Sequence, residues 1–189
     1  MNKKYNIEPA VIDVLKSGGI MLYPSDTIWG LGCDATNEEA CQKIIQIKKR
    51  KEEKSFIVLM DSIQMLEKYV PDFHPVCYDL IDLATSPLTI IYPTAKNLAP
   101  SILAAEGTVA IRITKDPLCL ALIQTLKKPI VSTSANLSGD PHPTCYNDIS
   151  HEIIAGSTVV LEERLHEKMT TPSKIIKIDL DGTIKVIRK

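Results

Sequence analysis

A run of basic residues at positions 48–51, reading Lys-Lys-Arg-Lys, has side chains suited to binding phosphate groups. Arginine would offer a planar fork for phosphate oxygens and lysine a compact point charge. Such charges would also stabilise a departing pyrophosphate. The run follows an apolar pattern of helical spacing, so it also fits a solvated helix end whose cations offset the helix dipole. Taken alone, the run favours the second interpretation.

The segment 132–139 is a second polar cluster. It contains four hydroxyls, one amide and a glycine within eight residues, directly after an expected strand. Serine and asparagine often make local backbone hydrogen bonds, which would give an ordinary capped turn. Open α/β sheets, however, bind ligands beyond the carboxyl ends of their strands. Both interpretations stay open at this point.

The segment 24–30 and one isolated arginine complete the candidate chemistry. The segment combines a carboxylate at Asp26 and two hydroxyls with Trp29, the only tryptophan of the chain. A buried tryptophan usually belongs to the core, but so much polarity beside it indicates a pocket wall. Arg112 lies inside an apolar strand pattern and must reach solvent, a partner or an anion, because an unpaired buried charge is very costly.

Several other site classes find no support in the sequence. The four histidines show no metal-ligand spacing, and the acidic residues form no convincing glycosidase pair. Neither GxGxxG nor GxxxxGK[ST] occurs, so a nucleotide would not be held by a Rossmann or P-loop cradle. The cysteines form no CxxC pair, which argues against a disulfide framework or zinc ribbon and favours reduced, mostly buried thiols. These are Cys33, Cys41, Cys77, Cys119 and Cys145.

Composition describes an ordinary globular chain. Its 189 residues suit one domain, 1–189, with a core of its own, and 44% are hydrophobic and 24% charged. The net charge of −1 gives no global basic field for nucleic acid. The amino terminus lacks the apolar stretch of a signal peptide, and no run approaches membrane-spanning length. We therefore expect a cytoplasmic protein without a membrane partner.

The elements that must position these residues alternate along the first two thirds of the chain. We expect an Asn37-capped helix before the basic run, a helix from Asp116-Pro117, a loop at 25–32 after Pro24 and another loop at 93–107. Asp181-Gly182 predicts a terminal hairpin. Other expected helices are 9–16, 62–69 and 76–84, and expected strands are 20–23, 56–60, 88–92, 108–114, 130–133, 159–161, 175–178 and 183–187. This order predicts an α/β or α+β fold with a mixed sheet.

Six segments in sequence order resemble the signatures of the YrdC-like family. Residues 18–35, GGIMLYPSDTIWGLGCDA, are similar to its opening signature, and Lys48 and Arg50 supply its KxR element. SPLTIIY at 86–92 and VAIRI at 109–113 resemble two of its strands. PIVSTSANLSGDPHPT at 129–144 and TPSKIIKI at 171–178 resemble its serine- and asparagine-rich loop and its last motif. The similarity spans about residues 18–178 in the single-domain form, without room for the extra domain of longer relatives.

The resemblance implies a fold and a reaction. The fold would be a twisted sheet of mixed parallel and antiparallel strands with flanking helices and a concave groove. The reaction would make threonylcarbamoyl-adenylate and pyrophosphate from L-threonine, bicarbonate and ATP, with Mg²⁺ bound mainly through the nucleotide. The product would serve threonylcarbamoylation of tRNA and could be handed to a transferase complex.

Site residues are carried over position by position from the resemblance. Lys48 and Arg50 would act as the catalytic phosphate clamp. Arg112 would meet a carboxylate or a phosphate on the threonine side of the site. ATP would be bound by Lys48, Arg50, Ser134, Asn136 and Ser173, and threonine by Thr27, Arg112 and Ser132.

Some positions depart from the family pattern, and other functions stay open. Trp29 replaces the commoner tyrosine, Leu59 stands where many longer relatives have histidine, and Ser86 and Lys174 also differ. Some family members are described as RNA-binding, so the basic run could contact tRNA or double-stranded RNA phosphates. A YciO-like relative would tend to lack the tetrad of Lys48, Arg50, Ser134 and Asn136. Carbamoyl chemistry of the HypF type would require further modules.

Overall fold

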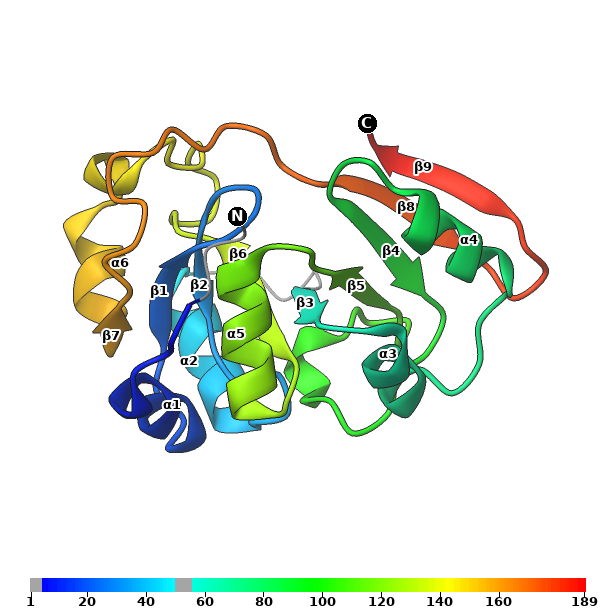
Figure 1. Ribbon diagram of the computed structural model, residues 1–189, viewed down its shortest axis with the longest axis horizontal. Helices are drawn as coiled ribbons and strands as arrows, with labels where there is room; N and C mark the ends of the chain where they lie inside the picture. Colours follow the sequence, from blue (N-terminus) through cyan, green and yellow to red (C-terminus); the bar gives the residue numbers. More distant parts are fainter. Residues whose placement is uncertain (1–4, 50–55) are drawn as a thin grey trace.

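The computed structural model describes residues 5–49 and 56–189, which form one mixed sheet with helices against its faces (Figure 1). Within these residues the sheet order is β7-β1-β2-β6-β3-β5-β4-β8-β9. The strands are β1 (Met21–Pro24), β2 (Trp29–Gly32), β3 (Ile57–Met60), β4 (Leu88–Tyr92), β5 (Val109–Ile113), β6 (Ile130–Ser134), β7 (Val159–Val160), β8 (Lys174–Ile178) and β9 (Ile184–Arg188). The helices are α1 (Pro9–Lys16), α2 (Glu38–Ile47), α3 (Ile63–Tyr69), α4 (Val76–Leu83), α5 (Pro117–Leu126) and α6 (His151–Gly156), with 3₁₀ turns η1 (Pro100–Ile102) and η2 (Tyr146–Asp148).

Parallel and antiparallel ladders are interleaved across the sheet. The pairs β3–β5, β1–β7 and β4–β8 are parallel, and the remaining neighbours are antiparallel. The mixed sheet with flanking helices confirms the fold class predicted from the sequence. The predicted hairpin is also confirmed, because β8 and β9 pair antiparallel around Asp181-Gly182.

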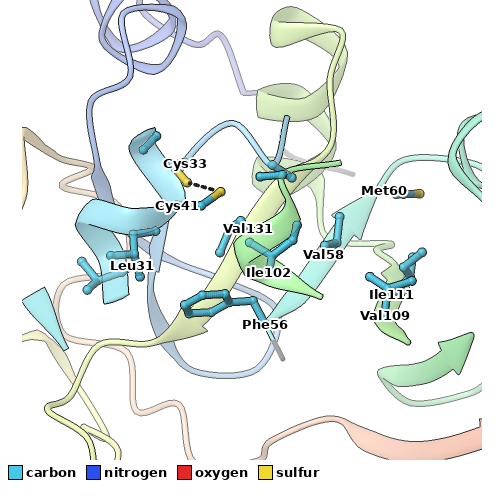
Figure 2. Packing of buried hydrophobic residues seen from close by; sticks show 14 of the residues in the cluster. Leu31, Cys33, Cys41, Phe56, Val58, Met60, Ile102, Val109, Ile111 and Val131 are labelled. Carbon is cyan, nitrogen blue, oxygen red and sulfur yellow. Dashed lines mark hydrogen bonds between the residues drawn. The ribbon is translucent and has the colours of Figure 1, made fainter. Parts of the chain in front are cut away.

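Strand alternation divides the core into two clusters on opposite sides of the sheet. Met21 and Leu59 belong with α1 and α5 in one cluster, whereas their strand neighbours Leu22 and Val58 belong to the other. This follows from the two-residue period of a strand. Figure 2 shows the larger cluster, in which the Sγ atoms of Cys33 and Cys41 lie 3.7 Å apart as free thiols. The hydrogen bond to Cys41, together with burial, raises the pKa of the Cys33 thiol.

Polar side chains begin the helices where the sequence predicts. Asn37 accepts a hydrogen bond from the Ala40 amide at α2, and Ser62 accepts one from Met65 at α3. Asp116 accepts from two amides at the start of α5. Such caps satisfy backbone donors that the first helical turn leaves unpaired. The predicted helices at 9–16, 62–69 and 76–84 are confirmed within a residue.

The loop predicted at 25–32 is wrong in its second half, because residues 29–32 form β2. Gly30 and Gly32 do not mark a turn: a Cβ on Gly32 would lie 2.7 Å from the Val131 carbonyl oxygen of β6. These glycines let neighbouring backbones approach closely. The expected loop 93–107 also contains the short 3₁₀ turn η1. Helix α6, which Ser150 caps, was not predicted from the sequence because it is only six residues long.

Because the backbones approach so closely, replacing a glycine of this strand by alanine should lower the free energy of unfolding, whereas such a replacement in a strand normally raises it. Glycine within a strand normally costs stability relative to alanine. Gly32→Ala should instead destabilise the protein by about 1 to 3 kcal/mol through overpacking, because the added Cβ would also lie 2.8 Å from both Met21 and Tyr23. Gly30→Ala, with its nearest contact at 3.0 Å, should lose less. Urea unfolding of both variants tests this order, and equal or increased stability would contradict it.

Candidate functional site

A groove of about 640 Å³ contains every predicted site residue that lies within the described part of the chain. Its lining includes side chains that are far apart in the sequence and come from loops, a helix end and two strands. They are Thr27, Lys48, Arg112, Ser132, Ser134, Asn136 and Ser173. Arg50 lies outside the described residues.

The strand order explains why these segments meet. β6 runs antiparallel to both of its neighbours. Its Ser134 lies opposite Gly30 of β2, and its Ser132 lies opposite Ile57 of β3. The carboxyl end of β6 therefore lies beside the amino ends of β2 and β3. The loop before β2, the loop after β6 and Phe56, the described residue just before β3, consequently lie at the same end of the central strands.

Lys48 is built into the loop after β6. Its side chain is only 3% exposed, and its Nζ donates to the backbone carbonyls of Ser134 and Asn136, the latter at 2.6 Å. In return the Lys48 carbonyl accepts from the Ser138 amide at 2.9 Å. Lys48 therefore does not fit the solvated helix-end interpretation. The neighbouring Lys49 does, because it forms a surface ion pair with Glu152.

Asn136 shapes the same loop and faces the groove. Its Nδ2 donates to the carbonyls of Leu137 and Asp140, at 3.0 and 2.6 Å. Its Oδ1 lies 3.4 Å from the Nζ of Lys48. Both interpretations of the polar cluster thus apply at once: local hydrogen bonds fold the loop, and the folded loop lines the groove.

Arg112 finds its partner in the loop between β1 and β2. It is 2% exposed on the central strand β5, and its Nη2 donates to Asp26 Oδ1 at 2.8 Å, while Asp26 is 15% exposed. The Arg112 Nε is buried without a partner within the described residues. The prediction that this arginine must reach solvent, a partner or an anion is confirmed, because its guanidinium pairs with Asp26.

Ser25 fixes the conformation of that loop. Its Oγ donates to the Ile28 carbonyl at 2.8 Å and accepts from the amides of Thr27 and Ile28 at 3.2 and 3.3 Å. It also lies 3.0 Å from the Thr27 Oγ1. This compact turn places Thr27 at the groove and directs Asp26 toward Arg112.

Arg188 is a groove residue that the sequence analysis missed. At the end of β9 it donates to the carbonyl and hydroxyl of Ser173 at 2.8 and 3.2 Å, and the Ser173 hydroxyl lies 2.8 Å from Thr89 Oγ1. Burial and the nearby positive charge of Arg112 both lower the pKa of Arg188. Two guanidiniums so close at one groove favour an anion between or beside them. The only signal in the sequence was a basic residue ending an apolar strand.

Departures from the family pattern lie largely away from the groove. Trp29 is fully buried against Tyr146, with ring centroids 5.3 Å apart, so its side chain belongs to the core and is not an aromatic wall of the groove. The polar loop that carries it does line the groove, through Thr27, Ile28 and Gly30. Leu59 is buried between the sheet and the helices α1 and α5. Lys174 is exposed at the start of β8, and Ser86 lines a second cavity.

The second cavity, of about 500 Å³, shares no lining residue with the groove. Ser25 and Asp26 form part of its wall, as do Ser86, Asp116 and Arg164. The loop between β1 and β2 thus separates two concave regions, with Thr27 facing one and Asp26 the other.

Metal cages and membrane segments find no support in the described residues. Within them, no three histidine, cysteine, aspartate or glutamate side chains are grouped so that they could hold a metal ion. None of the helices in this part of the chain is both long and apolar enough to cross a bilayer.

Known proteins are similar to this chain in sequence and in fold. The family profile Sua5_yciO_yrdC, described as telomere recombination, matches residues 13–189. Threonylcarbamoyl-AMP synthase of Aliivibrio fischeri is 35% identical over 179 residues, which cover 93% of this chain and 96% of that protein. Sua5 of P. abyssi complexed with L-threonine aligns with TM-score 0.81 and 24% identity, covering 94% of this chain and 54% of its own. YciO of E. coli aligns with TM-score 0.80 and 21% identity, covering 100% and 96%.

These structural relatives show the fold alone, and this chain spans about half the length of P. abyssi Sua5. YciO and Sua5 align almost equally well. The fold therefore does not distinguish between them, and the side chains at the groove must carry any functional assignment.

The buried ion pair predicts a large stability effect. Asp26→Ala would leave the Arg112 guanidinium buried without its carboxylate, which should cost about 3 kcal/mol of unfolding free energy. Lys49→Ala is the matched control: its pair with Glu152 is 66% and 50% exposed, so its loss should stay within about 0.5 kcal/mol. Denaturant unfolding measures both. A loss at Asp26 no larger than that at Lys49 would contradict the structural importance of the pair.

Proposed function

The chain belongs to the Sua5/YciO/YrdC family, and on that premise we propose that it is a threonylcarbamoyl-AMP synthase that uses L-threonine, bicarbonate and ATP. The observation that carries the proposal is the groove. Lys48, Arg112 and Arg188 line it together with the hydroxyls and amide of the two predicted loops. A cationic groove rich in hydrogen-bond donors suits a triphosphate and an amino-acid carboxylate.

The proposed reaction has two steps. The threonine amine first captures bicarbonate as a carbamate, with loss of water. A carbamate oxygen then attacks the α-phosphorus of ATP, the bond to the bridging oxygen breaks, and pyrophosphate departs. Little covalent chemistry is left for the protein, so alignment of the two substrates and neutralisation of phosphate charge would supply the rate enhancement.

On the nucleotide side, we assign phosphate binding to the residues around the loop after β6. The Lys48 ammonium already holds two carbonyls of this loop, so it would orient Ser134 and Asn136 as well as contribute positive charge. Ser173, hydrogen bonded to Arg188, would complete the site from the position just before β8. Arg50 is assigned to the same phosphate clamp on the family motif alone.

On the threonine side, we assign Thr27, Ser132 and Arg112. Thr27 is presented by the Ser25 turn, and Ser132 lies on the adjoining strand β6. Within the described residues, the Arg112 Nε is buried without a hydrogen-bond partner, beside the ion pair with Asp26. Because Arg112 lines the groove, its positive charge would favour binding of a substrate carboxylate there.

The same proposal implies a metal ion, a cellular location and a partner for the protein. Mg²⁺ would enter with the triphosphate and be held mainly through it. The chain would work as a single YrdC-like domain in the cytoplasm and pass its product to a tRNA threonylcarbamoyl transferase complex. If it lacks this activity, binding of tRNA or double-stranded RNA and a YciO-like role are the remaining functions.

Pyrophosphate release tests the reaction directly. Purified protein with ATP, Mg²⁺, bicarbonate and threonine should release pyrophosphate only when both bicarbonate and threonine are present. Lys48→Ala and Arg50→Ala should each slow release by about 100-fold or more, because each removes charge stabilisation of the transferred group.

Serine and amino-acid-free reactions are the controls for substrate, and circular dichroism confirms that the variants are folded. No threonine-dependent release from well-folded protein would overturn the proposal. RNA binding with a steep salt dependence and no ATP turnover would then support the RNA-binding alternative.

A second prediction concerns Arg188, which the family motifs did not supply. Arg188→Ala should weaken ATP binding by about tenfold, since it removes a cation and the hydrogen bond that the guanidinium donates to the Ser173 hydroxyl. Lys185→Ala on the same strand is the matched control: it pairs opposite Lys177 and does not line the groove. Titration calorimetry with a non-hydrolysable ATP analogue measures both variants. Equal affinities would exclude Arg188 from the nucleotide site.

A further inference from the structure

We infer that Arg164 is a positioning residue that locks the loop at residues 25–28 and thereby sets the affinity for threonine; the affinity part rests on the proposed function. Arg164 lies in the segment between β7 and β8, far from that loop in sequence. It does not line the groove. Its effect would be exerted through the loop and not by touching the substrate.

Arg164 makes polar contacts to two elements at once. Its Nη2 donates to Asp116 Oδ2 at 2.7 Å, and its Nη1 donates to the Ser25 carbonyl at 3.3 Å. The guanidinium carbon also lies 5.9 Å from the centre of the Tyr5 ring, within the range of a cation–π contact. Burial by itself lowers the pKa of Arg164, but its bonds to Tyr5 and Asp116 outweigh burial and raise the pKa, so the guanidinium stays charged.

Asp116 gives this contact a rigid base. Its Oδ1 accepts from the amides of Leu118 and Cys119 at the start of α5, both at 3.0 Å. Its Oδ2 is left for Arg164. One carboxylate thus joins the helix end to the guanidinium, and the planar fork of arginine extends the connection to Ser25.

Ser25 is the residue of the loop on which its conformation depends most. The Ser25 hydroxyl makes the hydrogen bonds that hold the Thr27 and Ile28 amides. Fixing the Ser25 carbonyl therefore fixes the turn that presents Thr27 to the groove. It also fixes the backbone next to Asp26, whose carboxylate pairs with Arg112.

The backbone of Arg164 is a second, independent observation. Its φ is +55°, in the left-handed region that residues with a side chain adopt at a cost. Glycine would adopt this conformation more easily. An arginine here gives up local backbone stability, and the contacts of its side chain explain what compensates for that loss.

The test uses four variants of the full chain. Arg164→Ala removes the side chain and keeps the strained backbone, whereas Arg164→Gly removes both the side chain and the strain. Arg164→Lys keeps the charge but cannot reach Asp116 and Ser25 with a planar fork. Lys168→Ala is the control, an exposed cation in the same segment.

In the pyrophosphate assay we expect the KM for threonine to change much more than the KM for ATP. Arg164→Ala and Arg164→Gly should raise the KM for threonine by about tenfold, the size of one lost charge-assisted hydrogen bond. The KM for ATP should change less than about twofold. Arg164→Lys should recover part of the loss, and Lys168→Ala should match the wild type. Equal effects on both substrates, or none, would overturn the inference.

Hydrogen exchange of the protein without substrates separates this inference from the proposed function. Amides of residues 25–28 should exchange faster in both Arg164→Ala and Arg164→Gly, although glycine relieves the backbone strain, and amides of β6 should not change. Unchanged exchange at 25–28 would overturn the inference whatever the enzyme does. Faster exchange in a protein that never uses threonine would retain the anchoring role and reject the proposed function.

Discussion

The buried guanidinium of Arg112 is the constraint around which this site is arranged. It lies on β5 near the middle of the sheet, where a charge without a partner would be prohibitively unfavourable. The carboxylate that neutralises it comes from Asp26, so the loop between β1 and β2 must lie close enough to β5 for the two side chains to pair. Ser25 then has to turn the chain tightly enough to bring Thr27 to the groove. One electrostatic requirement thus fixes the loop, the groove wall and the position of a candidate substrate contact.

The groove uses its cations in two different ways. Lys48 and Arg112 are largely committed to the protein: one holds loop carbonyls and the other an aspartate. Among the residues that the structure describes, Arg188 donates to the neutral Ser173 and lies near another guanidinium, so its charge is less compensated. A site of this kind is preorganised before any ligand arrives, which avoids reorganisation during the reaction. The uncompensated charge favours an anion, and the compensated charges determine the shape that receives it.

The sequence predicted much of this arrangement where the signal was local. Helix caps at Asn37 and Asp116 and the turn at Asp181-Gly182 are short-range features, and each was identified. Prediction from the sequence failed where the role of a residue depends on a neighbour that is distant in the sequence. Gly30 looked like a loop residue because the carbonyls of β6 that require a glycine there lie a hundred positions away. Arg188 was missed for the same reason, since only strand pairing brings it to Ser173.

The segment between β7 and β8 shows how the two sides of the groove are joined. Near its start Arg164 contacts the Ser25 carbonyl, and at its end Ser173 meets Arg188 on the nucleotide side. Midway, the Met169 amide donates to the Thr144 carbonyl at 2.7 Å, which ties the segment to the region after the loop of β6. A segment without regular structure is thus held at three points by elements that belong to different parts of the site. Its fixed length then constrains the spacing between those parts, so the proposed threonine and nucleotide positions are set by one connection and not independently.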